Sequence, residues 1–188
     1  MKIMTQTSPA TSRGTGVATT IAERPNALVV VDAQRGFIAG APNGKEVMNY
    51  VHWLLDSPQF DLVLATRFIN PDNSAFRRGL DYHDLGHGNA RTNLDEHVEQ
   101  RADRVITKYG YGIDSLDMDY IDDVLRGNNI DSATVVGFDT DACVLATAFS
   151  LCDAGIVPVI DSRGCGSSGG PEVHEAALKI AARNLRVM

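Results

Sequence analysis

Three residues carry the chemistry that this sequence suggests: Asp32, Lys108 and Cys143. Cys143 follows the apolar run 133–137 and lies near the start of an expected helix, 141–154. A helix start has a partial positive charge and free backbone N–H groups, which favour the thiolate form of cysteine and can hold an oxyanion. Asp32 could take the thiol proton, and Lys108 could stabilise the thiolate. Together they favour covalent attack on a carbonyl carbon.

Each of these residues also has an ordinary structural explanation. Asp32 could cap a turn, Lys108 could be solvated at a strand end, and Cys143 could be a small buried apolar side chain. Their combination favours the functional interpretation, because a nucleophilic cysteine needs a proton acceptor and a positive neighbour. The 5 histidines fall in expected helices or in a long loop, so none is placed to pair with the cysteine.

Apolar runs and helical patterns alternate along the chain and position the three residues. The runs are rich in β-branched residues, which is typical of strands buried on both faces, and they cover 27–32, 62–66, 104–107, 133–137 and 156–160. Helical spacing of apolar residues predicts helices at 44–55, 116–126, 141–154 and 171–184. This alternation predicts a parallel sheet with helices on both faces.

The carboxyl ends of parallel strands form the edge where such sheets bind ligands. Asp32, Lys108, Cys143 and Asp161 follow four different expected strands and therefore meet at this edge. The stretch Phe68–Asn93 has little periodicity, many Gly, His, Asp and Asn residues, and more length than a simple connection needs. We therefore expect a functional loop beside the site.

The composition excludes several classes of function. The chain has 188 residues, of which 44% are hydrophobic and 22% charged, with a net charge of −7 at pH 7. These values favour one globular domain and disfavour nucleic acid as a partner. No apolar run could span a membrane or serve as a signal segment, so we expect no membrane partner. An odd number of cysteines, 3, fits a cytoplasmic location.

The beginning of the chain differs in composition from the rest. Residues 1–24 are rich in Thr, Ser and Ala and have no apolar periodicity, so we expect a flexible N-terminal tail. Residues 25–188 are expected to form the single folded domain.

The folded part resembles the isochorismatase-like cysteine hydrolases, a superfamily that includes nicotinamidases, carbamoylsarcosine and ureidoacrylate amidohydrolases, and isochorismatases. The resemblance rests on a first-strand motif, a third-strand lysine and a motif around the cysteine: Val30-Val31-Asp32-x-Gln34, Lys108, and Gly137-x-x-Thr140-x-x-Cys143-Val144-x-x-Thr147-Ala148. It covers about residues 26–185 and identifies 25–188 as an isochorismatase-like hydrolase domain.

The resemblance implies an α/β fold, namely a three-layer α/β/α sandwich with a mostly parallel six-stranded sheet in the order 3-2-1-4-5-6. It also implies an Asp32–Lys108–Cys143 catalytic triad and a cis peptide bond between Phe138 and Asp139. By the same analogy, the backbone N–H groups of Asp139 and Cys143 form the oxyanion hole. Relatives commonly form dimers or tetramers, so we expect a homodimer or homotetramer.

The chain lacks the metal ligands of the metal-dependent nicotinamidases. Those enzymes carry an Asp-x-His pair just before a proline after the second strand, where this chain has Phe68-Ile69-Asn70-Pro71. His83 and His87 are spaced i, i+4 but lie in a Gly-rich loop, where solvated histidines are the simpler explanation. We therefore expect neither a metal nor another cofactor.

The presence of Cys143 favours covalent amide hydrolysis, because isochorismatases proper act on a vinyl ether and commonly lack this cysteine. We predict that the protein cleaves a C–N bond of a small amide or ureido compound through a thioester. Two alternatives stay open. One is an isochorismatase-type vinyl ether hydrolase in which Cys143 is a bystander, and the other is a catalytically silent binding subunit.

Several residues near the expected mouth of the site are candidates for contact with a small-molecule substrate. They are Gln34, Phe37, Arg67, Phe68, Tyr109 and Tyr111, with Arg35 and Cys165 left open. Arg67 or Arg35 could pair a substrate carboxylate, and the aromatic residues could form a pocket wall. Gln34 could orient the aspartate or the lysine. Cys152 is expected in the core, and Cys165 in a flexible loop after the fifth strand.

Overall fold

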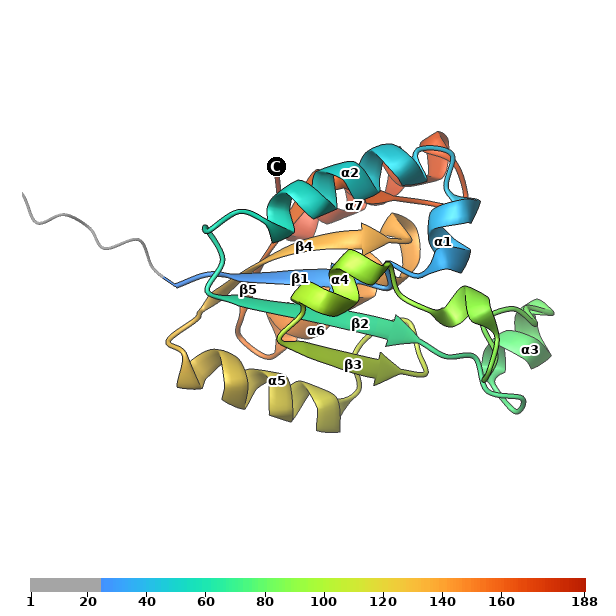
Figure 1. The fold of residues 1–188 in the computed structure, drawn as a ribbon, viewed down its shortest axis with the longest axis horizontal. Helices are drawn as coiled ribbons and strands as arrows, with labels where there is room; N and C mark the ends of the chain where they lie inside the picture. Colours follow the sequence, from blue (N-terminus) through green and yellow to red (C-terminus); the bar gives the residue numbers. More distant parts are fainter. Residues whose placement is uncertain (1–24) are drawn as a thin grey trace, which may run out of the picture.

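One parallel sheet organises residues 25–188, the part of the chain that this computed structural model describes (Figure 1). The expected tail, residues 1–24, lies outside the described residues. The strands are β1 (Ala27–Val31), β2 (Leu62–Phe68), β3 (Arg104–Lys108), β4 (Ser132–Phe138), β5 (Val157–Gly166) and β6 (Arg186–Val187). Their order, β3-β2-β1-β4-β5-β6, confirms the predicted topology.

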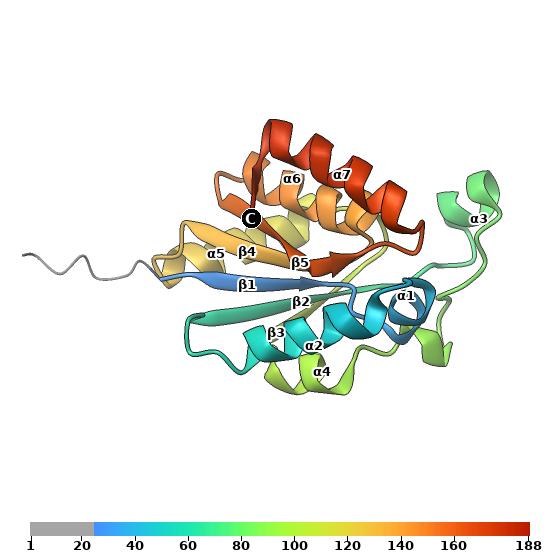
Figure 2. The same ribbon diagram turned by 90° about the horizontal axis from the view of Figure 1, so that it is seen from above.

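Helices cover both faces of the sheet. They are α1 (Arg35–Gly40), α2 (Gly44–Leu55), α3 (Ala75–Leu80), α4 (Glu96–Arg101), α5 (Ser115–Gly127), α6 (Leu145–Asp153) and α7 (Pro171–Asn184). Figure 2 shows α5, α6 and α7 on one face and α2 and α4 on the other. The predicted three-layer α/β/α sandwich is therefore confirmed.

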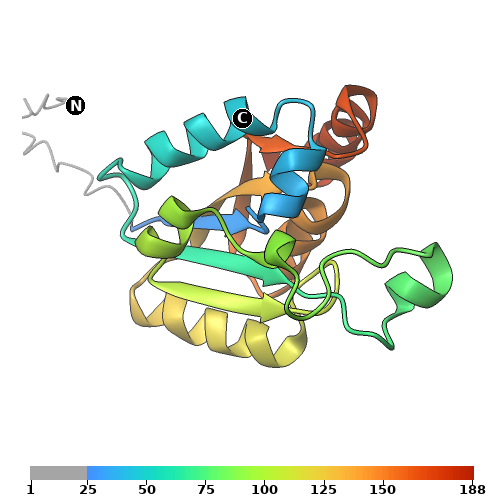
Figure 3. The ribbon, with the colours of Figure 1, turned by 45° about the vertical axis from the view of Figure 1, so that its right-hand side comes forward.

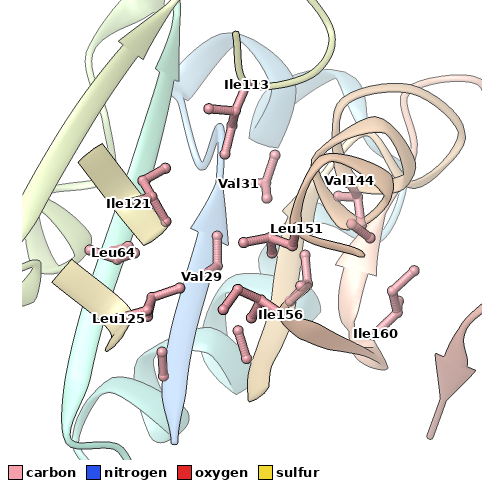
Figure 4. Close-up of a cluster of buried hydrophobic side chains, with 14 of the residues drawn as sticks. Val29, Val31, Leu64, Ile113, Ile121, Leu125, Val144, Leu151, Ile156 and Ile160 are labelled. Atoms are coloured by element: carbon pink, nitrogen blue, oxygen red, sulfur yellow. The ribbon is translucent and has the colours of Figure 1, made fainter. Parts of the chain in front are cut away.

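Two hydrophobic clusters, one on each face, hold the layers together. Val29 of β1 lies in the cluster under α5 and α6, beside Ile121 and Leu151 (Figure 4). Val30, the next residue, lies in the opposite cluster with Val51 of α2. Successive strand side chains point to opposite faces, so a strand covered on both faces needs apolar residues throughout. This explains why β1 is a continuous run of buried apolar side chains.

Strand β5 is longer than the sequence predicts, and this corrects the expected position of Cys165. The strand continues to Gly166, past an irregularity in its pairing with β4, and Cys165 is buried opposite Gly137. Asp161, expected at the strand end, is buried inside the strand. At Gly137 the φ angle is 121°, and a Cβ there would lie 2.0 Å from the Val31 carbonyl oxygen. Only glycine fits this close approach to β1.

Two further features differ from the predictions. Cys152 is exposed on α6 and does not contribute to the core. It lies nine residues after the buried Cys143, which places the two thiols on different sides of the helical segment. The short strand β6 lies at the edge of the sheet beside β5 and carries too few residues to give a sequence pattern.

The stretch between β2 and α4 extends beyond the carboxyl ends of the strands (Figure 3). It contains α3 and a single 3-10 turn, Ala90–Thr92. Asn70 supports it, because its side-chain amide donates to the carbonyl oxygens of Tyr82 and Asp84.

Within the described residues, no helix combines the length and apolar character needed to cross a membrane.

Candidate active site

Asp32 lies directly after β1, at the carboxyl edge of the sheet, and its side chain is fully buried. Its φ angle of 46° is unusual for a non-glycine residue, and Thr66 of β2 holds this conformation. The Asp32 N–H donates to the Thr66 carbonyl oxygen at 3.2 Å, and the Thr66 hydroxyl donates to Asp32 Oδ1 at 2.6 Å. These bonds fix the carboxylate with Oδ2 directed away from Thr66.

Lys108 ends β3 and is 1% exposed. Its Nζ lies 2.7 Å from Asp32 Oδ2 and donates to the carbonyl oxygens of Gly110 and Tyr111, each at 2.9 Å. Burial lowers the pKa of the Lys108 ammonium, but its interactions with Asp32, and with the Cys143 sulfur when that is ionised, outweigh burial and raise the pKa. Lys108 is therefore protonated at neutral pH and neutralises the buried Asp32 carboxylate.

Cys143 lies in a π-helical turn, Thr140–Val144, that joins β4 to α6. Its thiol is 4% exposed. Burial, followed by the charge of Asp32, raises the pKa of this thiol well above its ordinary value, and Lys108 only partly opposes the shift. The helix start and Lys108 favour the thiolate, as the sequence indicates, but burial and the neighbouring Asp32 carboxylate oppose it.

The turn that carries Cys143 is tied to neighbouring elements. The Asp139 carbonyl oxygen accepts the N–H groups of Ala142 and Val144, and the Asp139 carboxylate accepts both the N–H and the hydroxyl of Ser168. Thr140 Oγ1 lies 3.0 Å from the Gly166 carbonyl oxygen and also contacts α7. The peptide bond between Phe138 and Asp139 is cis. The backbone of this turn thus has a defined position beside Cys143.

Cys143 lies at the bottom of a pocket of about 430 Å³ that opens at the carboxyl edge of the sheet. One side of the pocket is a chain of aromatic side chains: Phe37, Phe68, Phe76 and Tyr111. We call these residues the aromatic wall. Phe76 connects the wall, because its ring packs edge-to-face against Phe68 at 5.0 Å and Tyr111 at 4.9 Å. The predicted positions of Phe37, Phe68 and Tyr111 at the site agree with this geometry.

Two other predicted substrate contacts, Arg67 and Tyr109, lie outside this pocket. Arg67 precedes Phe68 in β2 and therefore leaves the opposite face of the strand, where it donates to Glu99 of α4 at 2.8 Å. Tyr109 is 52% exposed and lies outside the residues that line the pocket. Arg35, which the sequence left open, is also outside it. None of these side chains can pair a substrate at Cys143 in this arrangement.

Gln34 supports the pocket and does not line it. Its side-chain amide donates to the carbonyl oxygens of Phe68 and Thr92, at 2.9 Å and 2.8 Å, and its Oε1 accepts the Phe68 N–H at 2.8 Å. The expected bond from Gln34 to Asp32 or Lys108 is therefore wrong, because its buried amide already bonds the backbone.

The long loop after β2 contributes pocket residues that sequence reasoning missed. They are Phe76, Leu80, Tyr82, Asp84 and Arg91. The sequence marks the loop as functional by its length and composition. It gives no signal for these individual side chains, since their orientation depends on contacts such as the bond from Arg91 Nε to Asp84 Oδ2 at 2.7 Å.

The second-strand position does not fit the metal ligands of metal-dependent relatives. The Asn70 side-chain amide donates its hydrogen bonds to the loop backbone, and His83 pairs with Asp81 on the exposed loop surface. No group of three or more His, Cys, Asp or Glu side chains within residues 25–188 is arranged to hold a metal ion.

The fold defines the class of this protein, an α/β/α domain with its candidate site at the carboxyl edge of a parallel sheet. The chain belongs to the isochorismatase family, since the model of the isochorismatase domain matches residues 26–188. The comparison with curated proteins finds no match.

Solved structures share the fold over most of their length. An isochorismatase-like hydrolase from Alkaliphilus metalliredigens has 20% identity and a TM-score of 0.74, covering 87% of this chain and 94% of that chain. A nicotinamidase from Bacillus subtilis has 21% identity and a TM-score of 0.72, covering 86% of this chain and 98% of that chain. A pyrazinamidase of Pyrococcus horikoshii in complex with zinc has 24% identity and a TM-score of 0.68, covering 87% of this chain and 98% of that chain.

Proposed function

We propose that this protein hydrolyses the C–N bond of a small amide or ureido compound through a thioester on Asp32, Lys108 and Cys143. The observation that carries the proposal is the buried ion pair between Lys108 Nζ and Asp32 Oδ2 at 2.7 Å, beside a buried thiol that opens onto a pocket. Two buried charges are costly unless their chemistry or pairing compensates, so such a cluster favours a functional site.

In the first half of the reaction, Asp32 acts as a base. Asp32 interacts with the Cys143 thiol as well as with Lys108, so its carboxylate can accept the Cys143 proton. The sulfur then forms a bond to the substrate carbonyl carbon. Backbone N–H groups of Asp139 and Cys143 hold the resulting oxyanion. Asp32 returns the proton to the substrate nitrogen, the C–N bond breaks, and ammonia or an amine leaves.

In the second half, a water molecule gives a proton to Asp32 and adds to the thioester carbonyl carbon. The C–S bond breaks, the acid product forms, and the sulfur recovers a proton from Asp32. Lys108 keeps its proton throughout and balances the negative charge as it moves between Asp32 and Cys143.

The raised pKa of the Cys143 thiol gives this scheme a specific order. A raised thiol pKa disfavours a free thiolate, so Asp32 takes the Cys143 proton as the sulfur attacks. The nicotinamidase and pyrazinamidase among the structural relatives support amide hydrolysis as the reaction class.

Assembly as a homodimer or homotetramer and a cytoplasmic location stay predictions.

The experiment that tests the proposal is a panel of small amides and ureides with ammonia release as the readout. We expect release from at least one member, with the matching acid as the second product. A vinyl ether compound in the same panel tests the isochorismatase-type alternative, which produces a carbonyl product and no ammonia. Turnover of the vinyl ether alone would contradict amide hydrolysis, and turnover of neither would favour the silent binding subunit.

Thr66→Val is expected to lower kcat about tenfold, because Asp32 Oδ1 loses the hydroxyl that fixes its carboxylate. Thr66 is buried and lies outside the pocket lining, so KM should stay nearly unchanged. Steady-state kinetics on the best amide of the panel measures both constants. Thr66→Ser, which keeps the hydroxyl, serves as the control and should restore kcat. An equal loss in both variants would show that Thr66 acts only through packing.

A further inference from the structure

The charged side chains around the pocket mouth are mostly acidic. Asp84, Asp139 and Asp141 line the pocket, and Arg91 is the only Lys or Arg among its lining residues. Lys108 and Asp32, which are buried and do not line the pocket, form a pair without net charge. The ionised pocket therefore has an excess of negative charge where the part of a substrate beyond its reacting amide would lie.

The Arg91 side chain is already engaged in hydrogen bonds within the protein. Its Nε donates to Asp84 Oδ2 at 2.7 Å, and its guanidinium also donates to the Gly36 carbonyl oxygen at 3.3 Å. The Asp84 carboxylate therefore balances the only guanidinium in the lining. A substrate carboxylate would meet this neutral pair and two further carboxylates.

Asp139 and Asp141 have no cationic partner among the described residues. Asp139 accepts hydrogen bonds from the N–H and the hydroxyl of Ser168, and Asp141 accepts one from the Ser167 hydroxyl. These donors are neutral and supply no compensating positive charge, and burial raises the pKa of the Asp139 carboxyl. Asp141 is exposed at the pocket surface, within reach of a ligand.

The aromatic side chains add a surface that suits a cation. The faces of aromatic rings carry negative electrostatic potential and attract ammonium groups. Acidic neighbours add to burial in raising the pKa of two tyrosines that line the pocket. Burial and the charges of Asp84 and Asp139 raise the pKa of Tyr82 to about 12. Burial, Cys143 and Asp141 raise the pKa of Tyr111.

We propose that this pocket selects amides that carry an ammonium group away from the reacting bond, and that it rejects amides carrying a carboxylate. Asp141 and Asp139 would attract the ammonium, and the aromatic wall would enclose the apolar part of the molecule. The assignment of these ligands as substrates rests on the proposed amide hydrolysis. The charge preference itself concerns binding and does not depend on turnover.

The test compares three ligands of similar size: benzylammonium, benzyl alcohol and benzoate. Calorimetric or NMR titration of the whole protein at low ionic strength measures each Kd. We expect benzylammonium to bind about tenfold more tightly than benzyl alcohol, with benzoate weakest. Added salt should reduce the difference. Asp141→Asn should remove most of the preference for benzylammonium, because it removes one charge and keeps an oxygen for the Ser167 hydroxyl.

Asp119→Asn is the matched control. It removes the same charge from an exposed position on α5 and lies outside the pocket lining, so it should leave the preference unchanged. Benzoate binding as tightly as benzylammonium, no detectable binding of benzylammonium, or an unchanged preference in Asp141→Asn would each overturn the proposal. Amides hydrolysed without charge preference would overturn it while the proposed function stands. Benzylammonium selectivity without any turnover would uphold it and count against the proposed function.

Discussion

Cys143→Ala is expected to lower amide turnover at least about 1,000-fold, because no other group can form the thioester. The side chain is buried in a turn held by β5 and α7, so the smaller alanine should leave the pocket and the fold in place. Ammonia release under saturating substrate measures the loss, and thermal unfolding checks the fold. Substrate should still bind to the variant, since binding comes from the pocket walls.

Cys152→Ala is the matched control for this result. It removes the same kind of side chain from an exposed position on α6 and should keep full activity. Rapid quench of the unmodified enzyme followed by mass spectrometry should show the acyl group on Cys143. Substantial ammonia release by Cys143→Ala would exclude the thioester mechanism and leave Asp32 and Lys108 as the acting groups.

Asp32→Asn is expected to lower kcat by about 100- to 10,000-fold and, at the same time, to lower the pKa of the Cys143 thiol. Turnover falls because the base is gone. The pKa falls because the Asp32 carboxylate is one of the groups that raise it, while the Lys108 ammonium remains. The variant should therefore alkylate faster near neutral pH while it hydrolyses amide more slowly.

The measurement is the pH profile of iodoacetamide labelling, carried out in a Cys152→Ser background because the exposed Cys152 thiol would otherwise react as well. Lys108→Met should shift the labelling profile in the opposite direction. Lys108 lowers the pKa of the Cys143 thiol, so the loss of Lys108 should raise that pKa. Either change breaks a buried ion pair and can cost about 3–5 kcal/mol of stability, so unfolding curves accompany each variant. Labelling profiles that move together in both variants would contradict the assigned charges.

Much of the fold follows from local patterns in the sequence. β1 is a continuous apolar run, and β4 is buried from its second residue to its end, because helices cover both faces of the sheet. The amphipathic spacing in α2 predicts a helix because Val47, Val51 and Leu54 fall on its buried side. Strand β6 and the short helices α1, α3 and α4 escape prediction, since a few residues carry too little periodicity to distinguish them from loops.

The candidate site, like the fold, is predicted by the sequence only in part. The sequence by itself determined that Asp32, Lys108 and Cys143 lie at or just after the ends of separate strands, because strand ends are local features and parallel strands end at one edge. Residue type then limits the chemistry that a carboxylate, an ammonium and a thiol can perform.

Only the tertiary structure decided how these groups act on one another. The raised pKa of the Cys143 thiol depends on burial and on the through-space charge of Asp32. The direction of Arg67 away from the pocket depends on which face of β2 is covered. The acidic mouth of the pocket, with Asp84 and Asp141 far apart in the chain, depends on how the long loop folds over the sheet edge. Hydration, electrostatic potential and side-chain direction are properties of neighbours in space, and a linear sequence does not contain them until it has folded.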